Sequence, residues 1–386
     1  GSQLSSSNSL SILPSKPKIF HGRDIELRDI IHQLTYGFPR IAILGTGGIG
    51  KTSLAQAVIH HPNIEKKLEH RFFVSCDSAN NSLGLGVAAL LGAHLGLKPG
   101  KDLTKAVLKH FAGISASLLI LDNLETSWEP QDSRAGVEEF LSLLTDIEQL
   151  ALIITMRGAE RPAKVQWSRP FLPPLKPLDY DAARQTFFDI AEDNHKSEHV
   201  DQLLGLADNL PLAVNLIAHL AADEGCPNVL SRWETEKTAL LSNGLDKNSS
   251  LDASIALSLS SPRMYLAGAK DLLSLLSILP DGLSDIELLQ CGLPIRNILT
   301  CKATLLGTSL AYINGKKRLR SLVPIRQHVL QLYPPSKNVV EPLRNHFHLL
   351  LELYRNYGGQ FQVAAQLNQI NDNLGNLHQL LKQELS

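Results

Sequence analysis

Hydrophobic residues in the first half of the chain occur in short uninterrupted runs separated by amphipathic stretches. The runs have the length of buried strands and lie at Ile41–Leu44, Arg71–Cys76, Ser117–Asp122 and Leu150–Thr155. Helical periodicity fills the intervals, at Leu83–Gly96, Lys101–Ile114 and Arg134–Ile147. Such alternation is typical of a parallel sheet with helices on both faces. We therefore predict an α/β domain over residues 17–175, after a tag and linker over residues 1–16.

The strand pattern ends at the proline-rich stretch Arg169–Leu178, and only helical patterns follow it. They lie at Tyr180–Ala191, His199–Asp208, Pro211–Ala222 and Val229–Leu241. We predict a helical domain over residues 176–247.

The third part of the chain combines helical patterns with a hairpin signal. The helical patterns lie at Leu251–Ser260, Met264–Leu279, Ser284–Gln290, Arg296–Gly307 and Pro324–Leu332. Asn314-Gly315 lies between alternating segments, which is a strong short-range sign of a β-hairpin. Three helices followed by a hairpin describe a winged helix, predicted over residues 248–336. Residues 337–386 are again helical and are interpreted as the start of a repeat-like region.

Composition narrows the classes of partner. The 386 residues are 44% hydrophobic and carry a formal net charge of -1, so charge does not favour nucleic acid or a membrane surface as a partner. The longest apolar runs are shorter than the roughly 18 to 20 residues of a membrane helix. Four scattered cysteines without a CxxC pair indicate reduced thiols. We expect a cytoplasmic protein.

The string GTGGIGKTS, residues 45–53, follows the first predicted strand and fits the phosphate-binding loop pattern in full. Glycines allow positive φ values and let consecutive main-chain N–H groups surround an anion. Lys51 supplies a charge for the β- and γ-phosphates, and the Thr52 hydroxyl can bind Mg²⁺. The predicted nucleotide-binding residues of this loop are Gly45, Gly47, Gly48, Ile49, Gly50, Lys51, Thr52 and Ser53.

Two later strands end in polar residues that suit the same ligand. Asp122 closes the apolar run 118–121, at the sheet edge where ligands of α/β folds gather, and we expect it to hold Mg²⁺ through water. Thr155 and Arg157 end the next strand, and an arginine there can reach a terminal phosphate.

Together these motifs resemble the NB-ARC module of the STAND class of signal-transduction ATPases, over residues 17–336. IFHGRDIEL (Ile19–Leu27) matches the family's opening motif, which implies that Phe20 and Arg23 contact the nucleotide. DNLPLAVNLIA (Asp208–Ala218) matches the GLPLA element, which implies that Pro211 packs against adenine. By this likeness the strand with Arg157 should lie between the phosphate-loop strand and the strand ending in Asp122. The stretches SKPKIFHGR and DNLET are most similar to fungal members of the family.

Three positions depart from the family pattern. Asn123 replaces the second acidic residue and cannot accept a proton from water at neutral pH, so Glu125 is the nearest substitute. The GLPLA glycine is Asn209. Val323 stands where the family's Met-His-Asp segment has its histidine, and Arg326 and His328 lie three and five positions later. The predicted catalytic residues are thus Lys51, Asp122, Glu125 and Arg157.

The resemblance implies a nucleotide-dependent switch of an NLR-like protein of innate immunity or programmed cell death. ADP would hold a closed form, and ATP with Mg²⁺ would favour self-association, with slow hydrolysis. An effector upstream and a repeat sensor downstream are expected outside this chain. The alternative is a transcriptional regulator that binds DNA through a basic wing (Lys316, Lys317, Arg318 and Arg320), although nucleic acid is the less favoured partner. No acceptor-substrate motif supports a metabolic P-loop kinase.

Overall fold

The computed structural model describes residues 13–76, 86–98, 100, 102–192, 195–236, 251–266, 268–357 and 368–384. The chain divides into two compact units. The first holds the chain up to residue 186 except residues 46–48, and the second holds residues 46–48 and 187–386.

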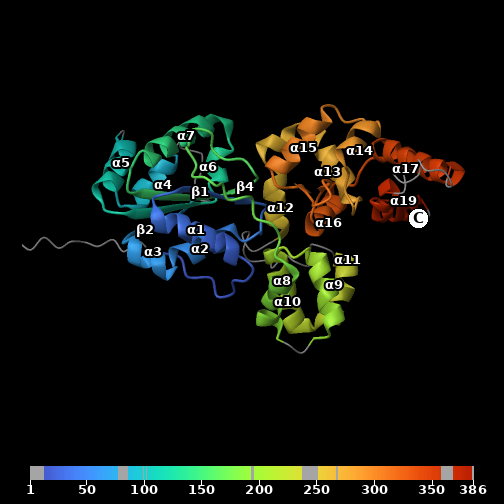
Figure 1. Ribbon diagram of the computed structural model, residues 1–386, viewed down its shortest axis with the longest axis horizontal. Helices are drawn as coiled ribbons and strands as arrows, with labels where there is room; N and C mark the ends of the chain where they lie inside the picture. The colour runs from blue at the N-terminus through green and yellow to red at the C-terminus, as the bar shows by residue number, and fades with distance from the viewer. Residues whose placement is uncertain are drawn as a thin grey trace, which may run out of the picture. The chain divides into compact units, whose positions relative to one another are not determined.

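A four-stranded parallel sheet forms the centre of the first unit (Figure 1). Its strands are β1 (Arg40–Gly45), β2 (His70–Ser75), β3 (Ser117–Asp122) and β4 (Leu150–Arg157). The order β1-β4-β3-β2 confirms the prediction that β4 lies between β1 and β3. Strands β3 and β4 are buried along nearly their whole length, which explains why they read as uninterrupted apolar runs.

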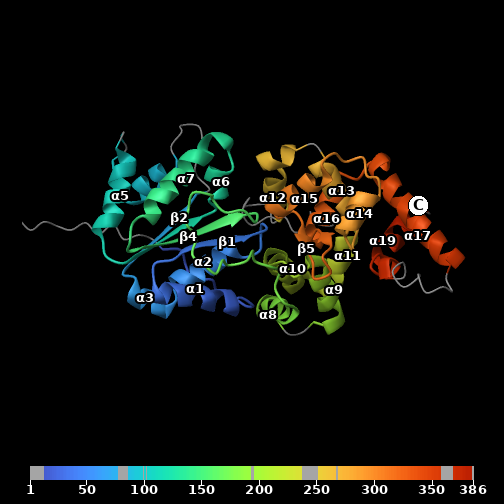
Figure 2. The same cartoon turned by 45° about the horizontal axis from the view of Figure 1, so that its top comes forward.

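Helices cover both faces of this sheet, as the strand–helix alternation predicts (Figures 1 and 2). One face carries α1 (Asp24–Tyr36), α2 (Lys51–Ile59) and α3 (Pro62–Lys67). The other carries α4 (Val87–His94), α5 (Leu103–Gly113), α6 (Glu125–Trp128) and α7 (Gln131–Thr145). The sequence patterns did not single out α1, α3 or α6. Residues 83–85 and 101, predicted as helix, lie outside the described residues.

The second unit is mainly helical. Helix α8 (Tyr180–Ala191) spans the division at residue 186, and α9 (Ser197–Ala207), α10 (Pro211–Glu224) and α11 (Cys226–Glu236) follow it. Next come α12 (Leu251–Leu259), a 3₁₀ turn (Pro262–Tyr265), α13 (Ala269–Ser277), α14 (Asp285–Gln290), α15 (Ile298–Gly307), α16 (Val323–Leu332), α17 (Lys337–Tyr357) and α19 (Leu374–Glu384). The predicted helix end at 237–241 and the domain limit at 247 lie outside the described residues.

The predicted hairpin is present, but its turn is wider than the Asn-Gly pair suggests. Strands β5 (Tyr312–Ile313) and β6 (Leu319–Arg320) pair antiparallel. The N–H of Asn314 donates to the carbonyl of Arg318 at 3.0 Å, and Lys317 adopts the positive φ of 57°. The side-chain oxygen of Asn314 accepts from the amides of Lys316 and Arg318 at 3.0 and 2.9 Å. The side chain of Asn314 therefore stabilises the loop as an Asx turn. This longer turn places both amides within reach of the Asn314 oxygen, which a two-residue turn would not do.

Within the described ranges, no helix is both long enough and apolar enough to cross a membrane.

Candidate functional site

The glycine-rich loop lies between β1 and α2. Gly45, Gly48 and Gly50 adopt φ values of 148°, 74° and 94°, a region that side chains rarely enter. Gly50 is also the N-cap of α2. A glycine offers no side chain to the first helical amides, so these amides stay free of a side-chain cap and can serve an anion.

Lys51 is the first residue of α2 and is 6% exposed. Its ammonium group donates to the carbonyl of Gly45 at 3.1 Å. The pKa of Lys51 is lowered to about 8, chiefly by burial; the Glu125 carboxylate opposes this shift, the charge of Arg157 adds to it, and Asp122 opposes it. The side chain thus shares one electrostatic environment with the three other predicted catalytic residues.

Arg23 stabilises the loop from outside it. Its guanidinium is buried and donates to the carbonyls of Ile49 at 2.9 Å and Lys176 at 2.7 Å, and its pKa is lowered by that burial. A weaker bond at 3.3 Å joins it to Glu26. Arg23 is therefore a positioning residue for the phosphate loop, a role that its place in the opening motif did not reveal.

Asp122 closes β3 and accepts hydrogen bonds from two threonines. The Thr52 hydroxyl donates to its two oxygens at 3.0 and 3.1 Å, and the Thr155 hydroxyl donates to Oδ1 at 2.6 Å. Thr155 also accepts from the amide of Asn123 at 2.9 Å, where the chain turns with a φ of 55°. The sequence placed Thr155 at this edge but gave it no role. In the parallel sheet Leu121 pairs with Ile154, so the next residues along the two strands, Asp122 and Thr155, lie beside each other. The register of the two strands is the information that would have revealed this contact.

Glu125 begins α6, three residues after β3, and forms an ion pair with Arg157. Arg157 Nε lies 3.1 Å from Oε1 of the carboxylate, and the Arg157 amide donates to Oε2 at 3.2 Å. Glu125 is 8% exposed, and desolvation raises its pKa although Lys51 and Arg157 oppose the shift. The pair brings the proposed base and the proposed phosphate sensor into direct contact.

The oxygen ligands at this edge suit a magnesium ion. Mg²⁺ prefers carboxylate, hydroxyl and water oxygens, and the Thr52 hydroxyl and the Asp122 carboxylate face each other within 3.1 Å. Because the Thr52 hydroxyl donates its hydrogen to Asp122, its oxygen lone pairs remain available to an ion.

The other predicted site residues are more scattered. Phe20 precedes α1 and is half-buried, and Ser53 lies in the first turn of α2. Pro211 is the first residue of α10, in the second unit. Asn209 has a φ of 53°, which fits its replacement of the family's glycine.

Residues near the missing histidine have partners inside the second unit. The amide of Val323 donates to a carboxylate oxygen of Asp208 at 3.1 Å. Arg326 Nε donates to the carbonyl of Ser277 at 3.3 Å, and His328 Nδ1 lies 2.6 Å from Asp252.

The part of the chain that contains this site is similar to a known protein family. Residues 13–165 match the family model described as Novel STAND NTPase 1. This region includes the phosphate loop, Asp122, Glu125 and Arg157. No curated protein matches the chain.

Three solved structures are similar to this chain, and the first of them supports the fold. A Walker-type ATPase of Pyrococcus abyssi is 13% identical with a TM-score of 0.54, and the match covers 81% of this chain and 96% of that one. A STAND protein with a tetratricopeptide repeat sensor from Pyrococcus horikoshii is 18% identical, covering 96% of this chain and 55% of that chain, with a TM-score of 0.42. The ORC1 protein of Aeropyrum pernix in complex with DNA is 15% identical, covering 85% and 95%, with a TM-score of 0.45. The first unit has the α/β fold of P-loop NTPases.

Proposed function

We propose that this chain is a nucleotide-dependent switch that binds ATP or ADP with Mg²⁺ and hydrolyses ATP slowly. The observation that carries the proposal is the convergence of Lys51, Asp122, Glu125 and Arg157 beside the phosphate loop. The match of residues 13–165 to a STAND NTPase family supports the same reading.

Each group has a chemical task in this proposal. The loop amides and the Lys51 ammonium group neutralise the phosphates. Thr52 and Asp122 would hold Mg²⁺, which would supply positive charge to neutralise the phosphates. Arg157 binds the terminal phosphate, and Glu125 accepts a proton from the attacking water. Asn123 cannot accept a proton from water and Glu125 is only its substitute, so hydrolysis is slow.

The switch follows from differential affinity. A ligand shifts an equilibrium between two forms only as far as it prefers one of them, and Arg157 supplies such a preference because it can distinguish a triphosphate from a diphosphate. We propose that the triphosphate form self-associates in an NLR-like signalling protein acting in innate immunity or cell death. The second unit would then comprise a helical domain and a winged helix, with Pro211 against adenine.

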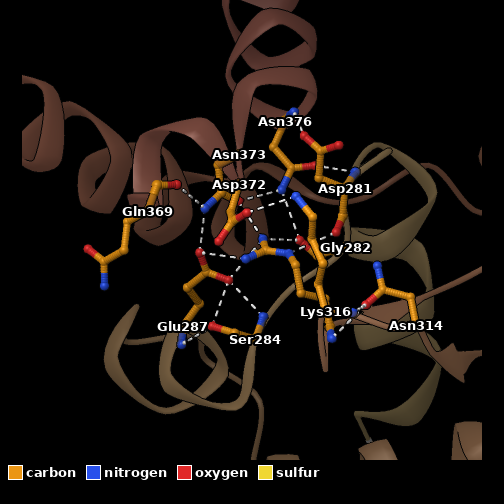
Figure 3. Close-up of polar contacts among 11 residues, drawn as sticks. Asp281, Gly282, Ser284, Glu287, Asn314, Lys316, Gln369, Asp372, Asn373 and Asn376 are labelled. Atoms are coloured by element: carbon orange, nitrogen blue, oxygen red, sulfur yellow. Dashed lines mark hydrogen bonds and ion pairs between the residues drawn. The ribbon is translucent and has the colours of Figure 1, made fainter. Parts of the chain in front are cut away.

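A DNA-binding regulator is the second candidate, and the hairpin argues against it. Arg318, one of the four basic residues of the predicted wing, is 4% exposed and lies 3.0 Å from a carboxylate oxygen of Glu287. Lys316 pairs with Asp372 at 3.0 Å (Figure 3). Two of the four charges are therefore engaged within the protein, which leaves a weak patch for DNA phosphates.

Calorimetric titration with Mg-ATP and with ADP tests the proposal. We expect binding by the wild-type chain and its loss in Lys51→Ala. Lys105→Ala removes a side chain that is 85% exposed and serves as the control. Equal affinities in the Lys51→Ala and wild-type proteins would contradict the site assignment.

A further inference from the structure

A narrow cleft lies beside the first residues of β1, between α1 and the segment that follows β4. It has about 190 Å³ of unfilled space, part of it open to solvent. The residues that line it include Gln33 of α1, Arg40 of β1, and Arg161, Ser168 and Phe171 of the later segment. Ligand pockets usually enclose about 300–1,000 Å³, so this cleft can hold one chemical group but not a whole nucleotide.

The cleft is separate from the phosphate loop. The Ser168 amide donates to the Arg40 carbonyl at 2.9 Å, and the Arg40 amide donates to the Ser168 hydroxyl at 2.9 Å. These bonds fix the later segment against the start of β1. Arg40 begins this strand and Gly45 ends it. Because a strand rises about 3.3 Å per residue, about 17 Å lies between the cleft and the phosphate loop.

Three arginines gather at the cleft. Arg40 and Arg161 line it, and Arg169 lies against the ring of Phe171, which lines it too. The guanidinium carbons of Arg161 and Arg169 lie 4.7 and 4.8 Å from the centre of this ring. The two charges are therefore within about 10 Å of each other, which is about one screening length at 0.1 M salt. Contact with one aromatic ring holds them together in spite of their repulsion.

Within the part of the chain that the structure describes, none of these three arginines forms an ion pair with a carboxylate. Arg40 and Arg161 donate instead to main-chain carbonyls, those of Thr145 and Leu172. Burial lowers the pKa of Arg161, because its charge has lost water without gaining an opposite charge. The cleft therefore keeps an excess of positive charge, although the whole chain has a formal net charge of -1.

This charge favours an anionic group. Guanidinium groups bind phosphate and carboxylate oxygens through paired N–H donors, and a cleft lined by one sign of charge concentrates the opposite ion. A phosphoryl group carries about −1.5 to −2 charges near pH 7, so it balances three cations better than a carboxylate does. Phe171 is 44% exposed, which leaves an apolar surface for the carbon part of a phosphate ester.

We propose that this cleft is a second anion site, which binds one phosphoryl group through Arg40, Arg161 and Arg169. The group is a free phosphate ion or the end of a phosphomonoester. The site does not depend on nucleotide binding at the phosphate loop.

Phosphorus NMR line broadening tests the proposal near pH 7, with phenyl phosphate and inorganic phosphate titrated separately. Both the wild-type chain and Lys51→Ala are measured, because Lys51→Ala removes phosphate binding at the loop and keeps the cleft. Arg161→Gln and Arg169→Gln are then made in Lys51→Ala. Arg28→Gln in the same background is the matched control, since it removes an equal charge from an exposed position of α1.

Arg161→Gln should weaken binding at least about tenfold, because it removes charge-assisted hydrogen bonds. Arg169 is exposed, so Arg169→Gln should fold normally and weaken binding about threefold. Arg28→Gln should bind as the Lys51→Ala chain does. Tighter binding of phenyl phosphate than of inorganic phosphate would assign the site to a phosphomonoester, and the reverse order would assign it to the free ion.

Three results would overturn the site. They are no broadening by the Lys51→Ala chain, unchanged affinity in both test variants, and an equal loss of affinity in Arg28→Gln. Displacement of phosphate by acetate at equal concentration would overturn the choice of a phosphoryl group.

Discussion

Arg157 holds Glu125 on two sides, through its guanidinium at 3.1 Å and its main-chain amide at 3.2 Å. A carboxylate bound in this way is a weaker partner for water, because each of its oxygens already has a partner and the positive charge of Arg157 lowers its basicity. A terminal phosphate competes for the same guanidinium. We therefore expect the triphosphate that Arg157 binds to be also the ligand that frees Glu125 to act as a base.

Replacing Glu125 with glutamine should slow ATP hydrolysis about 10²-fold or more, since a positioned general base contributes on the order of 10²–10⁴-fold. The side-chain oxygen of the introduced glutamine can still accept from the Arg157 amide, so nucleotide binding should persist. Single-turnover phosphate release measures the effect.

Glu139→Gln is the control, since Glu139 is exposed on α7. Phosphate release by Glu125→Gln at the wild-type rate would remove Glu125 from the mechanism.

The lowered pKa of Lys51 predicts a pH dependence of nucleotide affinity. Phosphates favour the ammonium form, so the pKa of Lys51 rises above about 8 when nucleotide binds. Binding must then take up a proton at pH values above about 8, and affinity should fall by up to about tenfold per pH unit there. Calorimetry at pH 8.5 in two buffers of different ionisation enthalpy measures the uptake.

Lys51→Arg separates this effect from other titrations. A guanidinium stays charged throughout this range, so the variant should lose the proton uptake that Lys51 causes. Uptake of equal size in both proteins would assign the titration to another group.

The sheet and the phosphate loop could be predicted because their signals are local. A run of four apolar residues before Asp122 specifies a buried strand, and the glycine spacing of residues 45–50 has few other structural uses. The bond from Arg23 to Ile49 could not be predicted, because it depends on how α1 returns to the loop. The opening motif indicated only that Arg23 belongs to the site.

The burial of Arg318 could not be predicted from the sequence either. Four basic residues in and beside a turn usually form a solvated face, and the sequence left a DNA-binding wing only as the alternative. The partner that buries Arg318 lies more than fifty residues later, at Asn373. Side-chain charge in a local window carries no information about such a partner.

Thr155→Val should destabilise the first unit by about 1–3 kcal/mol. The change removes the hydroxyl that joins Asp122 to the Asn123 amide and takes this partner from a part-buried amide. Valine has nearly the same volume and suits a strand, so packing is kept. Thermal unfolding measures the loss, and Thr104→Val, at an exposed position of α5, should leave the midpoint unchanged. A midpoint equal to that of the wild type would show that water replaces the hydroxyl.

Arg318→Met should cost about 3–5 kcal/mol of stability, because it leaves Glu287 charged and buried without its partner. Adding Glu287→Gln removes that charge while keeping an acceptor for the Ser284 cap. The double variant should therefore be more stable than Arg318→Met alone, although each change destabilises the wild type.

The exposed ion pair of Lys316 and Asp372 is the comparison. Lys316→Ala should lower the free energy of unfolding by less than about 1 kcal/mol. Urea denaturation compares all four. Additive losses in the double variant would mean that Arg318 acts through its bonds to the carbonyls of Asp281 and Gly282 and not through Glu287.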